Sequence, residues 1–88
     1  MTETEFRKSA QERGFSDPTV KEWPSLFSDQ VHTHERDVYL LVIKGRLSIT
    51  IAEETTDYFE GDCCHLKAET PHFEQTGSQG ATTLIALK

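Results

Sequence analysis

Three histidines carry most of the chemistry that this chain could perform. His32 and His34 stand two residues apart, in the stretch His32-Thr33-His34, and His72 directly follows Pro71 farther along the chain. Side chains two apart on an extended strand point to the same face, so His32 and His34 can present two imidazoles side by side. Neutral imidazole is a ligand suited to zinc, iron, nickel or copper. The spacing indicates a metal site, which His72 would complete if folding returns its segment to the first pair.

The histidines lie in the part of the chain that has β-strand patterns. After residue 15, short apolar or alternating runs are separated by segments rich in Gly, Pro and acidic residues. We expect strands over 19–23, 30–34, 38–43, 47–51, 58–59, 63–66, 72–75 and 82–87. We expect turns over 44–46, 53–57, 60–62 and 77–80. Short strands separated by turns every eight to twelve residues or so predict an all-β sandwich or a small barrel.

The first fifteen residues have a different character. They are mostly polar and charged, with few apolar side chains. Thr2 or Thr4 could cap a short helix, and Gly14 could end it. Such a helix would be marginal alone, because so little apolar surface is available to dock it. We therefore predict an N-terminal extension over 1–15, helical or extended, followed by a single domain over 16–88.

The size of the chain bears on its assembly and compartment. A chain of 88 residues buries only about 60–65% of its unfolded surface, so its core is thin. A partner that covers apolar strand residues would help, and we expect a homodimer. The two cysteines, Cys63 and Cys64, are neighbours and offer neither a disulfide framework nor a CxxC metal motif.

Net charge and hydropathy exclude several classes of partner. The formal net charge of −6 disfavours nonspecific binding to nucleic acid and to anionic membrane surfaces. The N-terminus is acidic and has no apolar run of the signal-peptide type. The longest apolar stretch, Val38 to Ile43, is far too short to cross a bilayer. We expect a cytoplasmic protein that binds neither nucleic acid nor membranes.

Two stretches of the sequence resemble the two motifs of the cupins, a superfamily of small β-barrel proteins. The stretch from His32 to Gly45 resembles the first motif, which has HxH, three or four residues, usually Glu, six residues and then Gly. The stretch from Gly61 to His72 resembles the second motif, GDxxxxPxGxPH, in its first Gly-Asp and its final Pro-His. The two motifs stand in the right order and spacing, and the resemblance covers roughly residues 19–88. It is closest to small single-domain cupins of the cupin 2 type.

The resemblance implies a fold and a metal site. The implied fold is all-β, a small double-stranded β-helix (a jelly-roll, RmlC-like barrel) behind the N-terminal segment. His32, His34 and His72 would project into the barrel and hold a divalent transition metal, which would be iron, manganese, nickel or zinc. Open positions on that metal would accept a small-molecule ligand.

The fourth ligand of the family is where this chain departs from the pattern. Cupins usually have glutamate four or five residues after the second histidine, where this chain has Val38 and Tyr39. Asp37 is adjacent, but a regular strand would turn it away from the histidine face unless a bulge re-aims it. We expect three histidines plus water, or three histidines plus a displaced Asp37 or Tyr39.

Several other residues could line the pocket. Cys64 and Leu66 share one strand face while Cys63 and His65 share the other, and one pair should face the barrel interior. The Tyr39 hydroxyl could point at a ligand, or the ring could belong to the core and its hydroxyl to a backbone partner. Phe73 could wall the pocket or pack in the core. The pocket candidates are Tyr39, Cys64, Leu66 and Phe73.

Two functional hypotheses follow from the resemblance. The first is a metal-dependent enzyme in which the metal acts as a Lewis acid or activates dioxygen, performing isomerase, lyase or oxygenase chemistry on a small molecule. The fold hosts all of these reactions, so the sequence does not choose among them. The alternative is a non-catalytic metabolite-binding or sensing module with weak or no metal, which the missing glutamate would favour.

Overall fold

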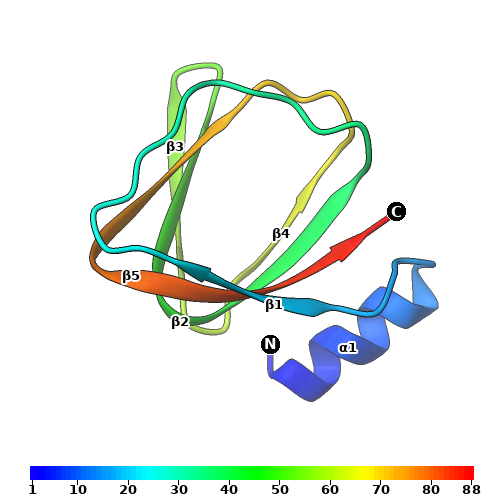
Figure 1. Cartoon of the computed structure of the whole chain (residues 1–88). Coiled ribbons are helices and arrows are strands. Elements are labelled where there is room, and N and C mark those ends of the chain that lie inside the picture. The colour runs from blue at the N-terminus through cyan, green and yellow to red at the C-terminus, as the bar shows by residue number, and fades with distance from the viewer.

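Two long strands, β2 (Val38–Ile51) and β5 (Phe73–Leu87), organise the barrel. The computed structural model describes all 88 residues, and every strand pair in it is antiparallel. The strands run in the order β1-β5-β2-β3, with β4 paired to the first half of β2. The remaining elements are α1 (Glu3–Glu12), β1 (Thr19–Trp23), β3 (Glu54–Phe59) and β4 (Cys63–Leu66). Figure 1 shows the strands curling around an interior with α1 outside, which confirms the predicted barrel with a short N-terminal helix.

Two turns expected from the sequence are bends within these long strands. Residues 44–46 and 77–80 were expected as turns, but β2 and β5 run through them, and their pairing shifts register between Val42 and Lys44 and again between Gly45 and Leu47. Gly45 has a φ of 76°, and a Cβ there would collide with the carbonyl oxygen of Gly80. Glycine was the right signal for a local break, but it marks β-bulges at which the paired strands bend together.

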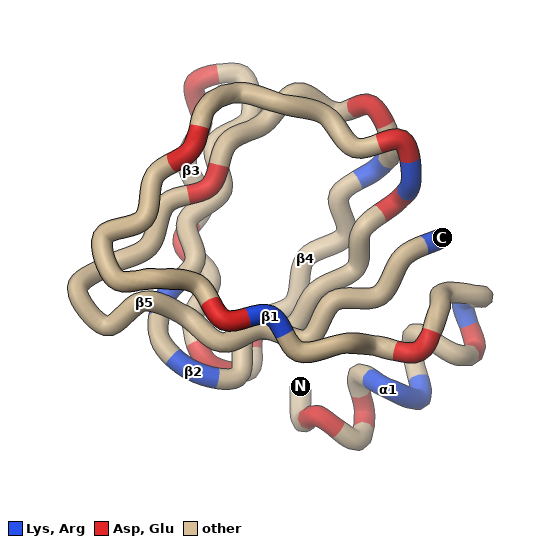
Figure 2. The backbone as a smooth tube through the Cα atoms, viewed as in Figure 1, with Lys and Arg blue, Asp and Glu red and all other residues tan.

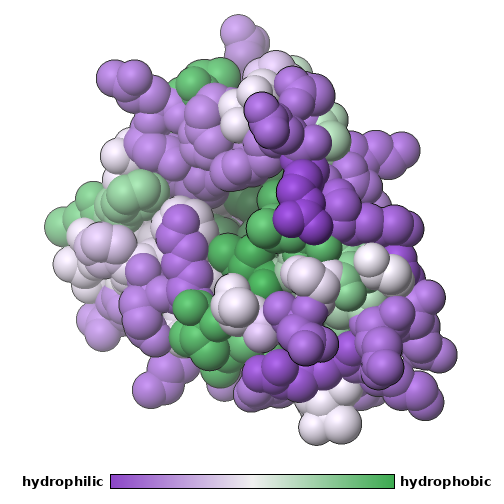
Figure 3. Space-filling view, turned by 45° about the vertical axis from the view of Figure 1, so that its right-hand side comes forward, coloured by the Kyte–Doolittle hydropathy of each residue, from purple (hydrophilic) through white to green (hydrophobic).

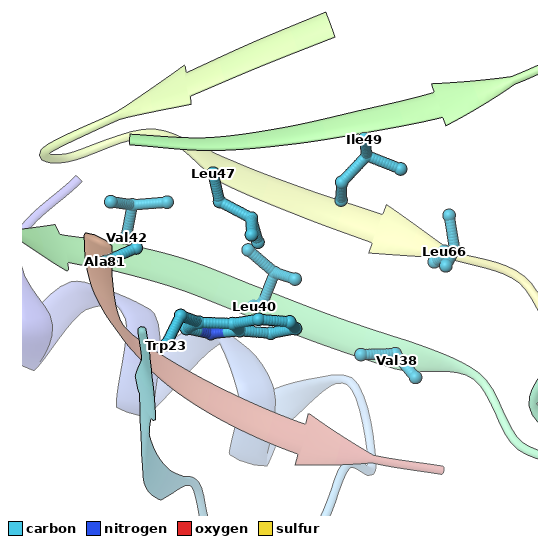
Figure 4. Packing of buried hydrophobic residues seen from close by; sticks show 8 residues of the cluster. All are labelled: Trp23, Val38, Leu40, Val42, Leu47, Ile49, Leu66 and Ala81. Atoms are coloured by element: carbon cyan, nitrogen blue, oxygen red, sulfur yellow. The ribbon is translucent and has the colours of Figure 1, made fainter. Parts of the chain in front are cut away.

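The interior is filled by one cluster of eight buried apolar residues (Figure 4). Trp23 comes from β1 and Leu40 and Leu47 from the two halves of β2, so both ends of the long strand contribute to one core. The full cluster is Trp23, Val38, Leu40, Val42, Leu47, Ile49, Leu66 and Ala81.

The N-terminal helix covers the opposite, outer face of the sheet. Phe6 is fully buried, and its ring lies 4.5 Å from the ring of Tyr39 on β2. Thr2 caps α1 in a reciprocal capping box with Glu5, as one of the two expected caps. Gly14, with a φ of 81°, follows the helix end. The extension is therefore a docked helix rather than a frayed segment.

Charged positions occur over much of the backbone, but β4 has none and β5 has only Glu74. Figure 2 shows Lys and Arg interspersed with Asp and Glu around the barrel and along α1. The only helix, α1, is too short and too polar to span a bilayer.

Candidate metal centre

The segment before β2 is held to the start of β5 at the two histidine positions. His32 and His72 exchange both of their backbone hydrogen bonds, at 2.9 and 3.0 Å, in an isolated antiparallel bridge. The ring centroids of His32 and His72 lie 4.4 Å apart. His34 joins them, with its ring centroid 5.0 Å from that of His32 and 5.1 Å from that of His72. The fold thus returns the third histidine to the first two, as the sequence required.

Glu74 is the fourth member of this group. It lies two residues after His72 on β5, so both side chains leave the same face of the strand. One carboxylate oxygen of Glu74 is 2.8 Å from Nε2 of His72 and 3.3 Å from Nε2 of His32. One ligand atom from each of His32, His34, His72 and Glu74 lies within 4.8 Å of the other three. Three imidazoles and a carboxylate therefore converge on one point.

Backbone carbonyls fix which nitrogen of two histidines faces that point. Nδ1 of His32 is 2.7 Å from the carbonyl oxygen of Gln30, and Nδ1 of His72 is 2.8 Å from that of Thr70. A carbonyl only accepts hydrogen bonds, so each Nδ1 carries a proton, and the neutral form of each ring turns the lone pair of Nε2 toward Glu74. Two lone pairs and a carboxylate oxygen then face one another, and only a cation, a proton or a metal ion, can lie among them favourably.

This arrangement is what a metal ligand set requires. Metal-binding histidines usually donate their second N–H to a carbonyl or carboxylate, which orients the ring. The carbonyls of Gln30 and Thr70 do this for His32 and His72. A set of three imidazoles and one carboxylate suits a divalent transition metal. The residues present therefore fit the metal that the sequence predicted.

Asp29 contacts both the backbone of Glu74 and the ring of His32. Its Oδ1 accepts a 2.7 Å hydrogen bond from the backbone N–H of Glu74, and its Oδ2 lies 3.7 Å from Nδ1 of His32. Burial, with a smaller contribution from Asp29, raises the pKa of the Glu74 carboxyl. The hydrogen bond to Gln30 is the main cause that raises the pKa of His32, while burial and neighbouring positive charges lower the pKa of His34.

The two predicted alternatives for a fourth ligand lie outside this group. Asp37 accepts hydrogen bonds from the backbone N–H of Ala68, at 2.8 Å, and from Nε2 of His65, at 3.0 Å. The Tyr39 hydroxyl lies 3.0 Å from Oγ of Ser9 on α1. Both predictions are corrected for one reason: Val38 faces the cavity, so its neighbours at 37 and 39 point to the outer face, and no bulge re-aims them.

A cavity of about 300 Å³ adjoins the four candidate ligands. Its wall is mainly apolar, with Trp23 and Phe27 beside aliphatic side chains of β2, β4 and β5. In the space-filling view, hydrophobic residues are visible in a hollow on this face, between hydrophilic rims (Figure 3). The His32, His34, His72 and Glu74 side chains all line the cavity, so a metal held by them would be open to a ligand.

The predicted pocket residues divide between this cavity and other surroundings. Leu66 lines the cavity, and Cys64 packs against the interior cluster behind it. Cys63 packs against the outer cluster, so the interior pair is Cys64 and Leu66. Tyr39 is part of the outer core, and Phe73 lines a separate depression on the far side of His72.

Glu74 is the residue that the sequence reasoning missed. His72-Phe73-Glu74 has the same two-residue spacing as His32-Thr33-His34, and the same face rule applies to both. The search for a carboxylate considered the positions four and five after His34, where the resemblance predicted it. The alternation rule applied to His72 would have found Glu74.

Comparisons with known proteins agree with this geometry. The Cupin_2 family model, described as a cupin domain, matches residues 20–87, and the chain belongs to this family. No curated protein sequence matches the chain significantly.

Solved structures show the same fold at low sequence identity. A protein of unknown function from Rhizobium leguminosarum is 20% identical with a TM-score of 0.72, over 81% of this chain and 69% of that one. A cupin-2 domain protein from Shewanella frigidimarina is 15% identical with a TM-score of 0.66, over 76% of this chain and 64% of that one. A structure from a study of DMSP lyases is 21% identical with a TM-score of 0.72, over 81% of this chain and only 37% of that one. These identities establish a shared fold alone.

Proposed function

We propose that this cupin holds one divalent transition metal on His32, His34, His72 and Glu74 and uses it to bind and polarise a small molecule in the adjoining cavity. One observation carries the proposal: His32, His34, His72 and Glu74 each bring one ligand atom within 4.8 Å of the others, and backbone carbonyls turn Nε2 of His32 and His72 toward Glu74. His72 and Glu74 are buried, where a carboxylate and an imidazole are costly unless a cation or a proton lies between them, while His32 is half-buried and His34 is exposed. The group also opens onto a cavity large enough for a small ligand.

The chain's own residues would divide the work at this centre. The three imidazoles and Glu74 would hold the metal, and Asp29 and the two backbone carbonyls would keep those ligands oriented. The apolar wall would exclude bulk water from the ligand. When bound, the metal would supply Lewis-acid polarisation of a ligand oxygen, with iron adding the capacity for oxygen chemistry.

Isomerase, lyase and oxygenase reactions all remain compatible with this centre. Fold neighbours include a structure from a study of DMSP lyases and one from a study of oxalate decarboxylase, each below 25% identity. The non-catalytic alternative drew its support from the absence of glutamate after His34. That support is lost because Glu74 supplies a carboxylate at the same cluster.

The test is the metal content of the protein purified without a histidine tag. We expect close to one equivalent of iron, manganese, nickel or zinc, measured by elemental analysis, and its loss when His32 and His72 are both changed to Ala. His65→Ala is the matched control, because His65 is bound to Asp37 and Arg13 outside the cluster. Absence of metal after growth with all four ions, or equal loss in His65→Ala, would refute the proposal. Circular dichroism would show that each variant is folded.

The homodimer and the cytoplasmic location stay predictions. The first strand, β1, lies at an edge of the sheet, and Val20 on it is 60% exposed. A second copy of the chain pairing along β1 would cover both this edge and the Val20 side chain. Sedimentation equilibrium of the full chain would give the mass, about twice 10.0 kDa if the proposal holds.

A further inference from the structure

The cavity beside the candidate metal centre is polar only where the ligands gather. Eight of the 14 residues that line it are hydrophobic. Five of the six polar ones are the four candidate ligands and Asp29, which supports Glu74. The sixth is Lys21, the only lysine or arginine on the wall. A polyhydroxylated ligand would find few partners on such a wall, so the ligand must have an apolar body.

Lys21 is held at the cavity by its strand and by its neighbour. It precedes Trp23 by two residues on β1, and therefore leaves the same face as that buried indole. Its Nζ lies 4.1 Å from the centroid of the Trp23 ring, a cation–π contact that limits where the ammonium can go. The Trp23 indole N–H in turn donates to Oγ1 of Thr83, the residue opposite Lys21 on β5.

Apart from its contact with the Trp23 ring, the Lys21 ammonium has no carboxylate partner within the protein. Every ion pair in the chain joins other residues, although acidic side chains outnumber basic ones by 15 to 9. The two carboxylates of the cavity wall have other partners: Asp29 accepts from the Glu74 backbone, and Glu74 contacts His32 and His72. A lysine that stays unpaired in so acidic a chain, on the wall of an apolar cavity, is available to a ligand.

The charges around the cavity specify the charge of that ligand. A divalent metal would be balanced by the ionised carboxylates of Glu74 and Asp29, leaving the single positive charge of Lys21. A ligand in an apolar cavity binds best when its charge complements that of the wall. The cavity volume of about 300 Å³ corresponds to about ten water-sized volumes, and so to about ten non-hydrogen atoms.

We propose that the ligand is a small monocarboxylate with an apolar body, and that Lys21 binds its negative charge beside the metal. This inference rests on the proposed metal centre. Lys21 would be a specificity-determining residue, since it selects the charged acid over a neutral molecule of the same shape.

The test compares two probes of one shape on the zinc-loaded full chain. The probes are cyclohexanecarboxylate and its uncharged counterpart, cyclohexanecarboxamide. Trp23 is the only tryptophan, and it lines the cavity, so its fluorescence reports binding directly. We expect the carboxylate to bind at least about tenfold more tightly than the amide, as a charge-assisted hydrogen bond would give.

Three variants isolate the part that Lys21 plays. Lys21→Met should remove most of this preference, whereas Lys21→Arg should keep it. Lys8→Met, on the exposed face of α1, makes the same change in net charge and should change nothing. Zinc content is measured first in every protein. Absence of zinc in the wild type would overturn both proposals, while a zinc-loaded Lys21→Met that prefers the carboxylate as strongly as the wild type does would overturn this one alone.

Discussion

The barrel holds two groups of histidine and carboxylate side chains, one on each face of β2. They differ in whether other groups of the protein donate hydrogen bonds to them. On the outer face, Arg13 donates to Nδ1 of His65 at 2.8 Å, and Nε2 of His65 donates to Asp37 at 3.0 Å. The backbone N–H of Ala68 serves the second oxygen of Asp37. Every acceptor on this face has a donor within the protein.

The inner group has the same residue types, but no arginine or backbone N–H donates to its imidazoles or to the Glu74 carboxylate. The Glu74 carboxylate faces the lone pairs of His32 and His72, and their protons point away to the backbone. The outer group therefore stabilises the docked helix, whereas the inner group has only a shared proton to satisfy it within the chain and offers its ligand atoms to a metal ion. Residue type alone does not distinguish a structural hydrogen-bond network from a metal site, but the balance of donors and acceptors does.

The largest expected effect concerns the outer face. Phe6→Ala should destabilise the protein by about 3–5 kcal/mol, because it leaves a cavity where a fully buried ring contacts Tyr39. The folded fraction, measured at low temperature, should still bind its metal. Phe59→Ala, at a side chain that is 53% exposed, is the control and should cost far less. Chemical denaturation measures both, and loss of the metal from folded Phe6→Ala would mean that the two faces are coupled.

The second effect concerns the carboxylate of the inner group. Glu74→Gln should weaken binding of the divalent metal by about a hundredfold, since the only carboxylate among the four candidate ligands is lost. Asp37→Asn removes an outer carboxylate and should leave metal affinity unchanged. Competition with a chelator of known affinity gives both values. A larger loss in Asp37→Asn would contradict the assignment of the two faces.

Glu74→Gln should also stabilise the metal-free protein. Burial and Asp29 raise the pKa of Glu74 in the folded protein above the value of 4.5 that it has in the unfolded chain. The protonated carboxyl therefore stabilises the fold fully below pH 4.5, and this contribution is lost as the pH rises through the pKa of the folded protein. Glutamine does not titrate and can donate to an imidazole lone pair. Metal-free Glu74→Gln should therefore be about 1 kcal/mol more stable than the wild type near pH 8, with a flatter dependence on pH.

The direction of that change separates a functional residue from a structural one. Urea denaturation of both metal-free proteins at several pH values would measure it. If Glu74→Gln is instead the less stable protein at alkaline pH, the carboxylate stabilises the fold by itself and the argument from unpaired acceptors is wrong.

The smallest expected effect is a partial rescue. Val38 occupies the position at which cupins usually have glutamate, and it lines the same cavity as Glu74. Val38→Glu in the Glu74→Gln background should recover about tenfold of the lost metal affinity, because it returns a carboxylate to the cavity from β2. Val42→Glu, also buried and apolar but outside the cavity lining, should recover none. Isothermal titration compares the two double variants, and equal affinities would show that position 38 does not face the metal.

Much of the fold and part of the candidate site could be predicted from the sequence. The spacing of His32 and His34, and the two motifs, were sufficient to predict the barrel and to bring His72 back to the pair. The facing of His32 and His34 is local, since it depends on strand alternation, whereas the return of His72 from 40 residues away was implied by the resemblance to the two motifs. Docking of α1 was harder to predict from the sequence, because it depends on a contact between distant residues, Phe6 and Tyr39.

The errors came from register and from long-range partners. Asp37 and Tyr39 were considered as ligands because they are near His34 in sequence, but alternation around Val38 sends them to the helix side. Glu74 was missed because its partner in sequence is His72 rather than His34. The role of Asp29 depends on a hydrogen bond to a residue 45 positions away, and no local pattern predicts that contact.

The most direct measurement is an anomalous diffraction map from crystals of the full chain grown with zinc. We expect one zinc peak among His32, His34, His72 and Glu74, with ring nitrogens at about 2.0–2.1 Å and a Glu74 oxygen at about 2.0–2.2 Å. A map with no peak at this cluster, or with zinc bound there by fewer than three of the four side chains, would contradict the metal centre.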